Sequence, residues 1–163
     1  MKANRQIPER LRRVWAASIW APDAIPADEY KFRNLKRVMF PVIDVLFVLG
    51  GLSAAAYGVP AISEFFTNET VDLYAYTLST VAFVCFLGVA FPRLWPLEVM
   101  AKSALLGLNA LYFTALFILT AVGEGNRGFV VIIAAVAMCP IIWRINVLGS
   151  EWQERRLSEK ADA

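Results

Sequence analysis

Residues 38–57 read VMFPVIDVLFVLGGLSAAAY, an apolar run that contains a single charged side chain, Asp44. A helix of about 20 predominantly apolar residues is long enough to cross the hydrocarbon core of a bilayer. Three later stretches have the same character, at residues 73–91, 99–122 and 129–148. Short polar joints separate the four runs. The sequence therefore predicts an all-α fold, an integral membrane four-helix bundle.

The composition agrees with this class. Hydrophobic residues make up 58% of the 163-residue chain, against ~45–50% in a typical soluble domain. Four spans leave room for only one compact domain. We therefore expect a basic N-terminal segment at 1–37, a bundle at 38–148 and a short charged C-terminal helix within the tail at 149–163.

The basic residues predict an orientation. Nine Lys and Arg residues precede the first span, the joint at 58–72 has none, and the later joints have Arg93 and Arg127. Loops rich in Lys and Arg stay in the cytoplasm, so we expect a multi-pass protein of a bacterial inner membrane with both termini cytoplasmic. The basic region is longer than the ~15–30 residues of a signal peptide, so the first span is expected to remain uncleaved. A net charge of +2 does not favour a nucleic-acid partner.

Tryptophan is confined to the side predicted to be cytoplasmic. Amphipathic rings favour the level of the lipid headgroups, so we expect these side chains to be interfacial anchors. They are Trp15, Trp20, Trp95, Trp143 and Trp152.

Residues 8–20 have the pattern of a short amphipathic helix, with apolar residues at helical spacing opposite Arg10, Arg12 and Arg13. Such a helix is able to lie on anionic headgroups. The alternative is a helix docked on the cytoplasmic face of the protein itself. The tail at 150–163 carries mixed charges at i,i+4 spacing, typical of a solvated helix that continues the fourth span.

Three charged residues fall inside the predicted spans, namely Asp44, Lys102 and Arg144. With a helical rise of 1.5 Å per residue, all three lie in the cytoplasmic half. The sequence therefore predicts an intramembrane cluster in which Asp44 pairs with Lys102 or Arg144. The cluster is interpreted as structural, or as a site that handles protons or ions; Lys and Arg at this depth are also able to snorkel outward. Glu98 and Lys102, spaced i,i+4, are expected to form a pair on the helix surface.

Small residues at four-residue spacing mark predicted contact faces, because they let membrane helices approach closely. Within the bundle we expect this role mainly for the first and third spans, and self-association is the alternative use. The predicted packing residues are Gly51, Ala55, Gly58, Ser103 and Gly107.

Catalytic motifs are missing from the sequence. The chain has no histidine, the commonest general base and metal ligand. Cys85 and Cys139 lack the CxxC spacing of a redox or metal motif and are expected to be small buried residues. We therefore predict a non-enzymatic protein without a catalytic residue, metal or cofactor, whose partners are the bilayer and either its own copies or other membrane proteins.

Four spans with an acidic residue in the first resemble the small multidrug-resistance exporters. That resemblance implies proton coupling through Asp44. The chain departs from the family's pattern because this residue is Asp rather than Glu, lies near one interface, and is accompanied by long polar ends. No internal repeat of the kind that accompanies alternating access is visible.

The overall plan is similar to that of multi-span bacteriophage holins, with several spans, tight joints, a basic N-terminal segment and a charged tail. This resemblance implies lateral assembly that permeabilises the membrane. The alternative is an accessory or assembly subunit of a larger membrane complex, docked through the N-terminal helix and the tail.

Overall fold

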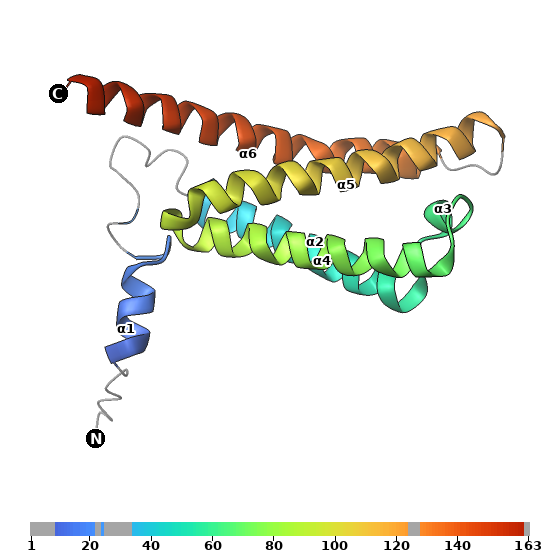
Figure 1. The fold of residues 1–163 in the computed structure, drawn as a ribbon, viewed down its shortest axis with the longest axis horizontal. Coiled ribbons are helices and arrows are strands. Elements are labelled where there is room, and N and C mark those ends of the chain that lie inside the picture. Colours follow the sequence, from blue (N-terminus) through green and yellow to red (C-terminus); the bar gives the residue numbers. More distant parts are fainter. Residues whose placement is uncertain (1–8, 22–23, 25–33, 124–127, 162–163) are drawn as a thin grey trace.

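The computed structural model describes residues 9–21, 24, 34–123 and 128–161. Within these residues the structure is helical and contains no strand, which confirms the predicted helical fold (Figure 1). Four helices are long and apolar enough to cross a membrane, as predicted. They lie at Leu35–Tyr57, Asn68–Ala90, Pro92–Ala121 and Gly128–Ser150.

The elements follow one another with short connections. In chain order they are α1 (Glu9–Ala16), η2 (Leu35–Met39), α2 (Phe40–Tyr57), α3 (Pro60–Ser63), α4 (Asn68–Ala90), η3 (Pro92–Leu94), α5 (Trp95–Ala121) and α6 (Gly128–Ala161).

Local sequence explains where α5 begins and where α2 ends. Pro96 lies in the first turn of α5, where the missing N–H has no helical partner to lose. Pro41 lies just after the π-helical turn η2, which α2 continues. Gly58 follows α2 with φ +78°, a conformation that glycine adopts without steric cost. Gly58 therefore ends a helix, and no described atom lies within 4 Å of a Cβ placed there.

The long helices pack in chain order. α2 contacts α4, α4 contacts α5, and α5 contacts α6. Figure 1 shows α1 and the C-terminal part of α6 at one end of the bundle, here called the terminal end, and α3 at the other, the distal end. The core between α4 and α5 includes Ala82, Cys85 and Leu105, each without exposed surface. Cys85 is buried as predicted, whereas Cys139 lies exposed on α6.

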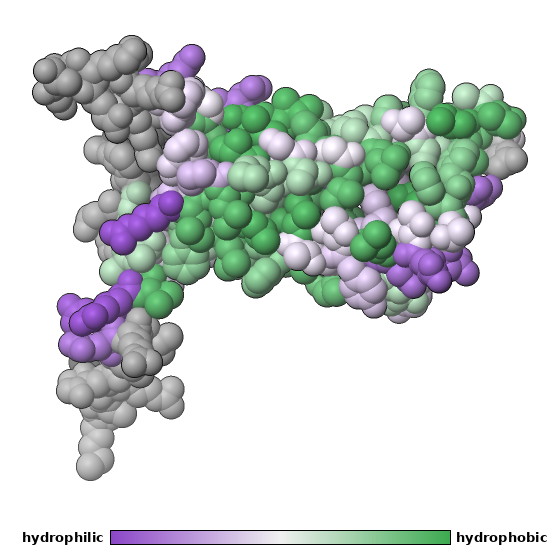
Figure 2. All heavy atoms as spheres, in the orientation of Figure 1, coloured by the Kyte–Doolittle hydropathy of each residue, from purple (hydrophilic) through white to green (hydrophobic). Residues whose placement is uncertain are grey.

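Large apolar side chains cover the outside of the bundle. Figure 2 shows an apolar surface over the long helices, with hydrophilic residues gathered toward the ends. Met100 is 72% exposed, Leu73 67% and Ile132 63%. Water would penalise such a surface, whereas lipid chains accommodate it.

The segment after α1 is held against the terminal end. The Ile19 amide donates a hydrogen bond to the Ala90 carbonyl (2.9 Å). The Trp20 indole N–H donates to the Arg37 carbonyl (3.1 Å), and Arg37 Nη2 donates to the Ala21 carbonyl (2.6 Å). The predicted helix at 8–20 therefore ends at Ala16, and it is the residues after it that dock on the protein.

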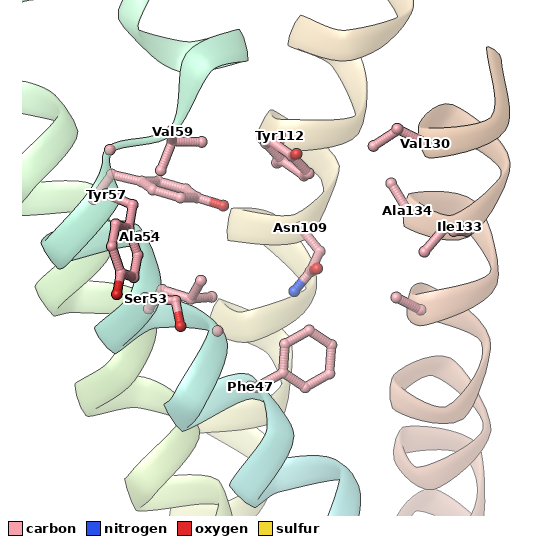
Figure 3. A pocket seen from close by; sticks show the side chains of 15 residues that line it. Phe47, Ser53, Ala54, Tyr57, Val59, Asn109, Tyr112, Val130, Ile133 and Ala134 are labelled. Carbon is pink, nitrogen blue, oxygen red and sulfur yellow. The ribbon is translucent and has the colours of Figure 1, made fainter. Parts of the chain in front are cut away.

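α2 and α6 meet at only one of their ends. At the terminal end the Phe40 and Trp143 rings lie edge to face, 6.5 Å apart. Toward the distal end a pocket of about 460 Å³ lies between the two helices, with α4 and α5 contributing to its wall (Figure 3). The bundle is therefore closed at the terminal end and open between α2 and α6 at the other.

Candidate functional site

Asp44 and Lys102 form a buried ion pair between α2 and α5. Lys102 Nζ donates a hydrogen bond to Asp44 Oδ1. Asp44 is 0% exposed and Lys102 is 1% exposed. Asp44 Oδ2 is buried and has no hydrogen-bond partner within the described part of the chain. Of the two partners predicted for Asp44, Lys102 and Arg144, the structure therefore pairs it with Lys102.

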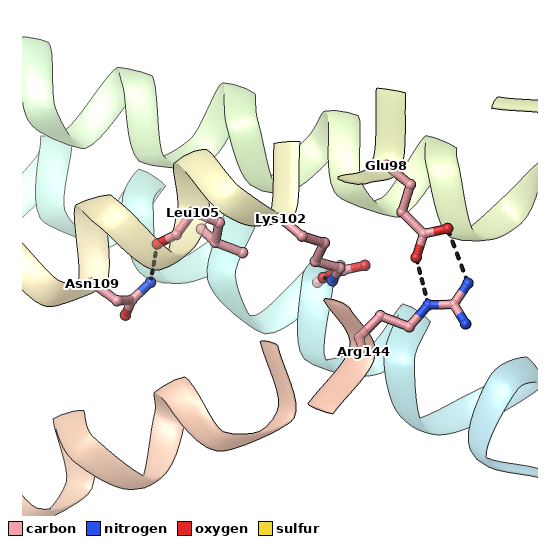
Figure 4. A network of polar contacts seen from close by, with 6 residues as sticks. Glu98, Lys102, Leu105, Asn109 and Arg144 are labelled. Atoms are coloured by element: carbon pink, nitrogen blue, oxygen red, sulfur yellow. Dashed lines mark hydrogen bonds and ion pairs between the residues drawn. The ribbon is translucent and has the colours of Figure 1, made fainter. Parts of the chain in front are cut away.

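The third predicted charge, Arg144, binds a different carboxylate. Its Nε donates to Glu98 Oε1 (2.6 Å) and its Nη2 to Glu98 Oε2 (2.9 Å), a two-pronged ion pair between α6 and α5 (Figure 4). The guanidinium carbon also lies 5.2 Å from the centroid of the Phe40 ring, within range of a cation–π interaction.

Glu98 does not lie where the sequence predicted. It was expected on the helix surface beside Lys102, and the structure places it 1% exposed and bound to Arg144. A glycine on α4 marks the burial of Glu98, because a Cβ at Gly88 would lie 2.6 Å from Glu98 Cβ. Gly88 therefore lets α5 approach α4 closely at the position of Glu98.

We call Asp44, Glu98, Lys102 and Arg144 the charge quartet. Glu98 and Lys102 lie one turn apart on α5, and so project from one face of the helix. Two acids and two bases give no net formal charge. Neither basic side chain snorkels outward, since Arg144 is only 5% exposed. The quartet ties α2 and α6 to α5, and removal of one partner would leave an uncompensated buried charge.

The predicted packing residues divide into two groups. A Cβ at Gly51 would lie 2.3 Å from Ser79 Oγ and 2.7 Å from the Ser79 backbone nitrogen, so Gly51 is a close-contact position between α2 and α4. Ala55 is half-buried on α2. Ser103 and Gly107 lie on the exposed face of α5, where no described atom lies within 4 Å of a Cβ placed at Gly107. Exposure of these two residues leaves self-association, the alternative use, as the prediction for them.

The five tryptophans belong to elements of the terminal end. Trp15 is exposed on α1, whereas Trp20 is half-buried, with its ring 6.4 Å from that of Phe86. Trp95 begins α5 and is half-buried. Trp143 and Trp152 are both exposed on α6. This placement is compatible with the predicted interfacial anchors.

Comparison with known proteins found no matching protein-family model, no matching curated protein and no matching solved structure. In the parts of the chain that the structure describes, no three His, Cys, Asp or Glu side chains group as a metal site would require. The class defined by the fold is a helical protein with four helices fit to span a membrane, closed at one end by buried ion pairs.

Proposed function

We propose that this chain is a non-enzymatic, four-span protein of a bacterial inner membrane that works as a holin does, assembling laterally with its own copies until the membrane becomes permeable. In this proposal the charge quartet keeps each bundle intact during assembly, and Asp44 acts as a packing residue rather than a proton carrier.

The observation that carries the proposal is a row of small residues on the outer face of α5. Ser103, Gly107, Ala110 and Thr114 recur at spacings of four and three, and all four are exposed. Membrane helices associate where such small side chains let the backbones approach. Because the bundle leaves this row unused, a second copy offers it a contact.

The exposed side chains of α1 support the proposal that this helix is cytoplasmic. Arg12, Arg13, Val14 and Trp15 are all exposed on this helix, although the segment after it is fixed to the bundle. Apolar and cationic side chains together suit the surface of a membrane with anionic lipids. We therefore propose that α1 lies on the cytoplasmic leaflet beside the bundle.

Controlled expression in a bacterial host tests the function. We expect an abrupt loss of membrane potential, and a large side chain in the row should prevent it. Gly107→Leu should abolish the loss, whereas Gly149→Leu, the same change at an open position of α6, should not. An unchanged potential at high expression would refute the holin-like proposal, and recovery of fixed heterologous partners in mild detergent would favour an accessory subunit instead.

Cysteine labelling tests the orientation separately. With Cys85 and Cys139 replaced by alanine, a single cysteine is introduced at Phe66 in the distal loop or at Ser150 on α6. A membrane-impermeant maleimide applied to intact cells should label Phe66→Cys and leave Ser150→Cys unlabelled until the membrane is opened. The reverse pattern would place the termini outside.

A further inference from the structure

The pocket between α2 and α6 is of the size and chemistry of a ligand site. Its volume of about 460 Å³ falls in the range of ~300–1,000 Å³ typical of small-molecule pockets. Its wall is mainly apolar and includes Phe47, Ala54, Leu78, Ile133 and Ala134. Ile133 is half exposed, so the pocket opens sideways, toward the surrounding lipid in the proposed membrane setting.

The wall of the pocket includes a buried polar side chain, Asn109, whose hydrogen-bonding capacity is only partly used. Asn109 is 8% exposed, and its Nδ2 donates to the Leu105 carbonyl of its own helix (2.9 Å). Its Oδ1 receives no hydrogen bond from the residues described. By contrast, the neighbouring Tyr74 hydroxyl donates to the Leu108 carbonyl (3.3 Å). Figure 3 shows Asn109 in the pocket wall, across from the α6 side chains, and Figure 4 shows its bond to Leu105.

The position of Asn109 along α5 limits which molecules could donate a hydrogen bond to its Oδ1. It lies fourteen residues after Trp95 and twelve before Ala121, which is about 21 Å and about 18 Å along α5 at 1.5 Å per residue. That places it near the middle of a hydrocarbon core about 30 Å thick. The polar groups of a phospholipid stay at the headgroup level, so they do not reach Asn109.

We propose that this pocket binds a small, lipid-soluble molecule whose apolar body fills the space between α2 and α6 and whose single hydroxyl donates a hydrogen bond to Asn109 Oδ1. Phenols and comparable aromatic alcohols have this chemistry. Such molecules partition into the bilayer, and their hydroxyl is able to reach its centre when a hydrogen-bond acceptor is present there. The proposal does not depend on lateral assembly of the chain.

Two probes that differ in one hydrogen-bond donor test the proposal. The full chain in lipid nanodiscs is titrated with 2-naphthol, and with 2-methoxynaphthalene, in which the donor is blocked. Empty nanodiscs give the partition background. We expect saturable binding of one 2-naphthol per chain, weaker by about 3- to 10-fold for the blocked probe, the discrimination expected of one neutral hydrogen bond.

Variants locate the binding in the pocket. Asn109→Leu should remove the preference for 2-naphthol and leave the affinity for the blocked probe unchanged. Ala134→Phe should abolish binding of both probes by filling the pocket, whereas Ala56→Phe, on the exposed surface of α2 outside the lining, should bind as the original does. Circular dichroism checks that each variant is folded.

Two results would overturn the proposal. The first is the absence of saturable 2-naphthol binding to the original chain. The second is equal binding of the two probes, which would make the pocket a space that acyl chains fill without selection. The comparison of probes on the unaltered chain stands even if Asn109→Leu does not fold.

Discussion

Replacing Lys102 by methionine would leave the Asp44 carboxylate buried without its counter-ion. Asp44 has no exposed surface, and Lys102 is its hydrogen-bond partner. Loss of one member of a buried ion pair costs about 3–5 kcal/mol, which lowers the folding equilibrium constant roughly 200- to 5,000-fold. We expect Lys102→Met to reduce the free energy of unfolding by this amount. Reversible unfolding in mixed micelles, followed by helical circular dichroism, measures it.

A double variant separates the pair from its surroundings. Asp44→Asn combined with Lys102→Met removes both charges, so that no uncompensated charge is left buried. The double variant should therefore recover most of the loss caused by Lys102→Met. Asp72→Asn, at an exposed position on α4, is the matched control. A Lys102→Met chain as stable as the original, or a double variant no better than Lys102→Met, would refute the reasoning.

Further predictions use the same unfolding measurement. Arg144→Lys should cost about 1.5–3 kcal/mol, because an ammonium does not reproduce the two-pronged bond to Glu98; unchanged stability would contradict the assigned geometry. Gly51→Ala should cost about 1–3 kcal/mol, since its Cβ would meet the Ser79 backbone at 2.7 Å. Gly149→Ala, in open space on α6, should instead stabilise the helix by up to about 1 kcal/mol. Equal effects of the two glycine substitutions would show that close packing is not the cause.

The four long apolar helices could be predicted from the sequence because the length and hydropathy of each stretch follow directly from its residues. The ends of the helices were harder to predict from hydropathy, because helices continue past their apolar sections. The stretch predicted at 73–91 belongs to α4, which begins at Asn68 and includes the charged Glu69 and Asp72. By contrast, α6 continues to Ala161 in one helix, as the i,i+4 charges of the tail predicted.

The charge quartet was only partly predictable. Depth along each helix follows from counting residues, and it brought Asp44, Lys102 and Arg144 to one level. Direction around each helix does not follow, because a helix that is apolar all round carries little information about its inward face. Glu98 was therefore assigned to its neighbour on the same helix, although Gly88 marks the close approach that buries it.

The distance along the chain between Asp44 and Lys102 has a consequence for biosynthesis. The two residues are 58 positions apart, so at ~5–20 residues per second the ribosome needs about 3–12 s to reach Lys102 after Asp44. During that interval α2 and α4 are able to pair through Gly51 and Ser79, but the carboxylate has no counter-ion. The arrival of α5 thus completes the first hairpin as well as adding a third helix. A chain that stalls before Lys102 would therefore hold the Asp44 carboxylate without its counter-ion.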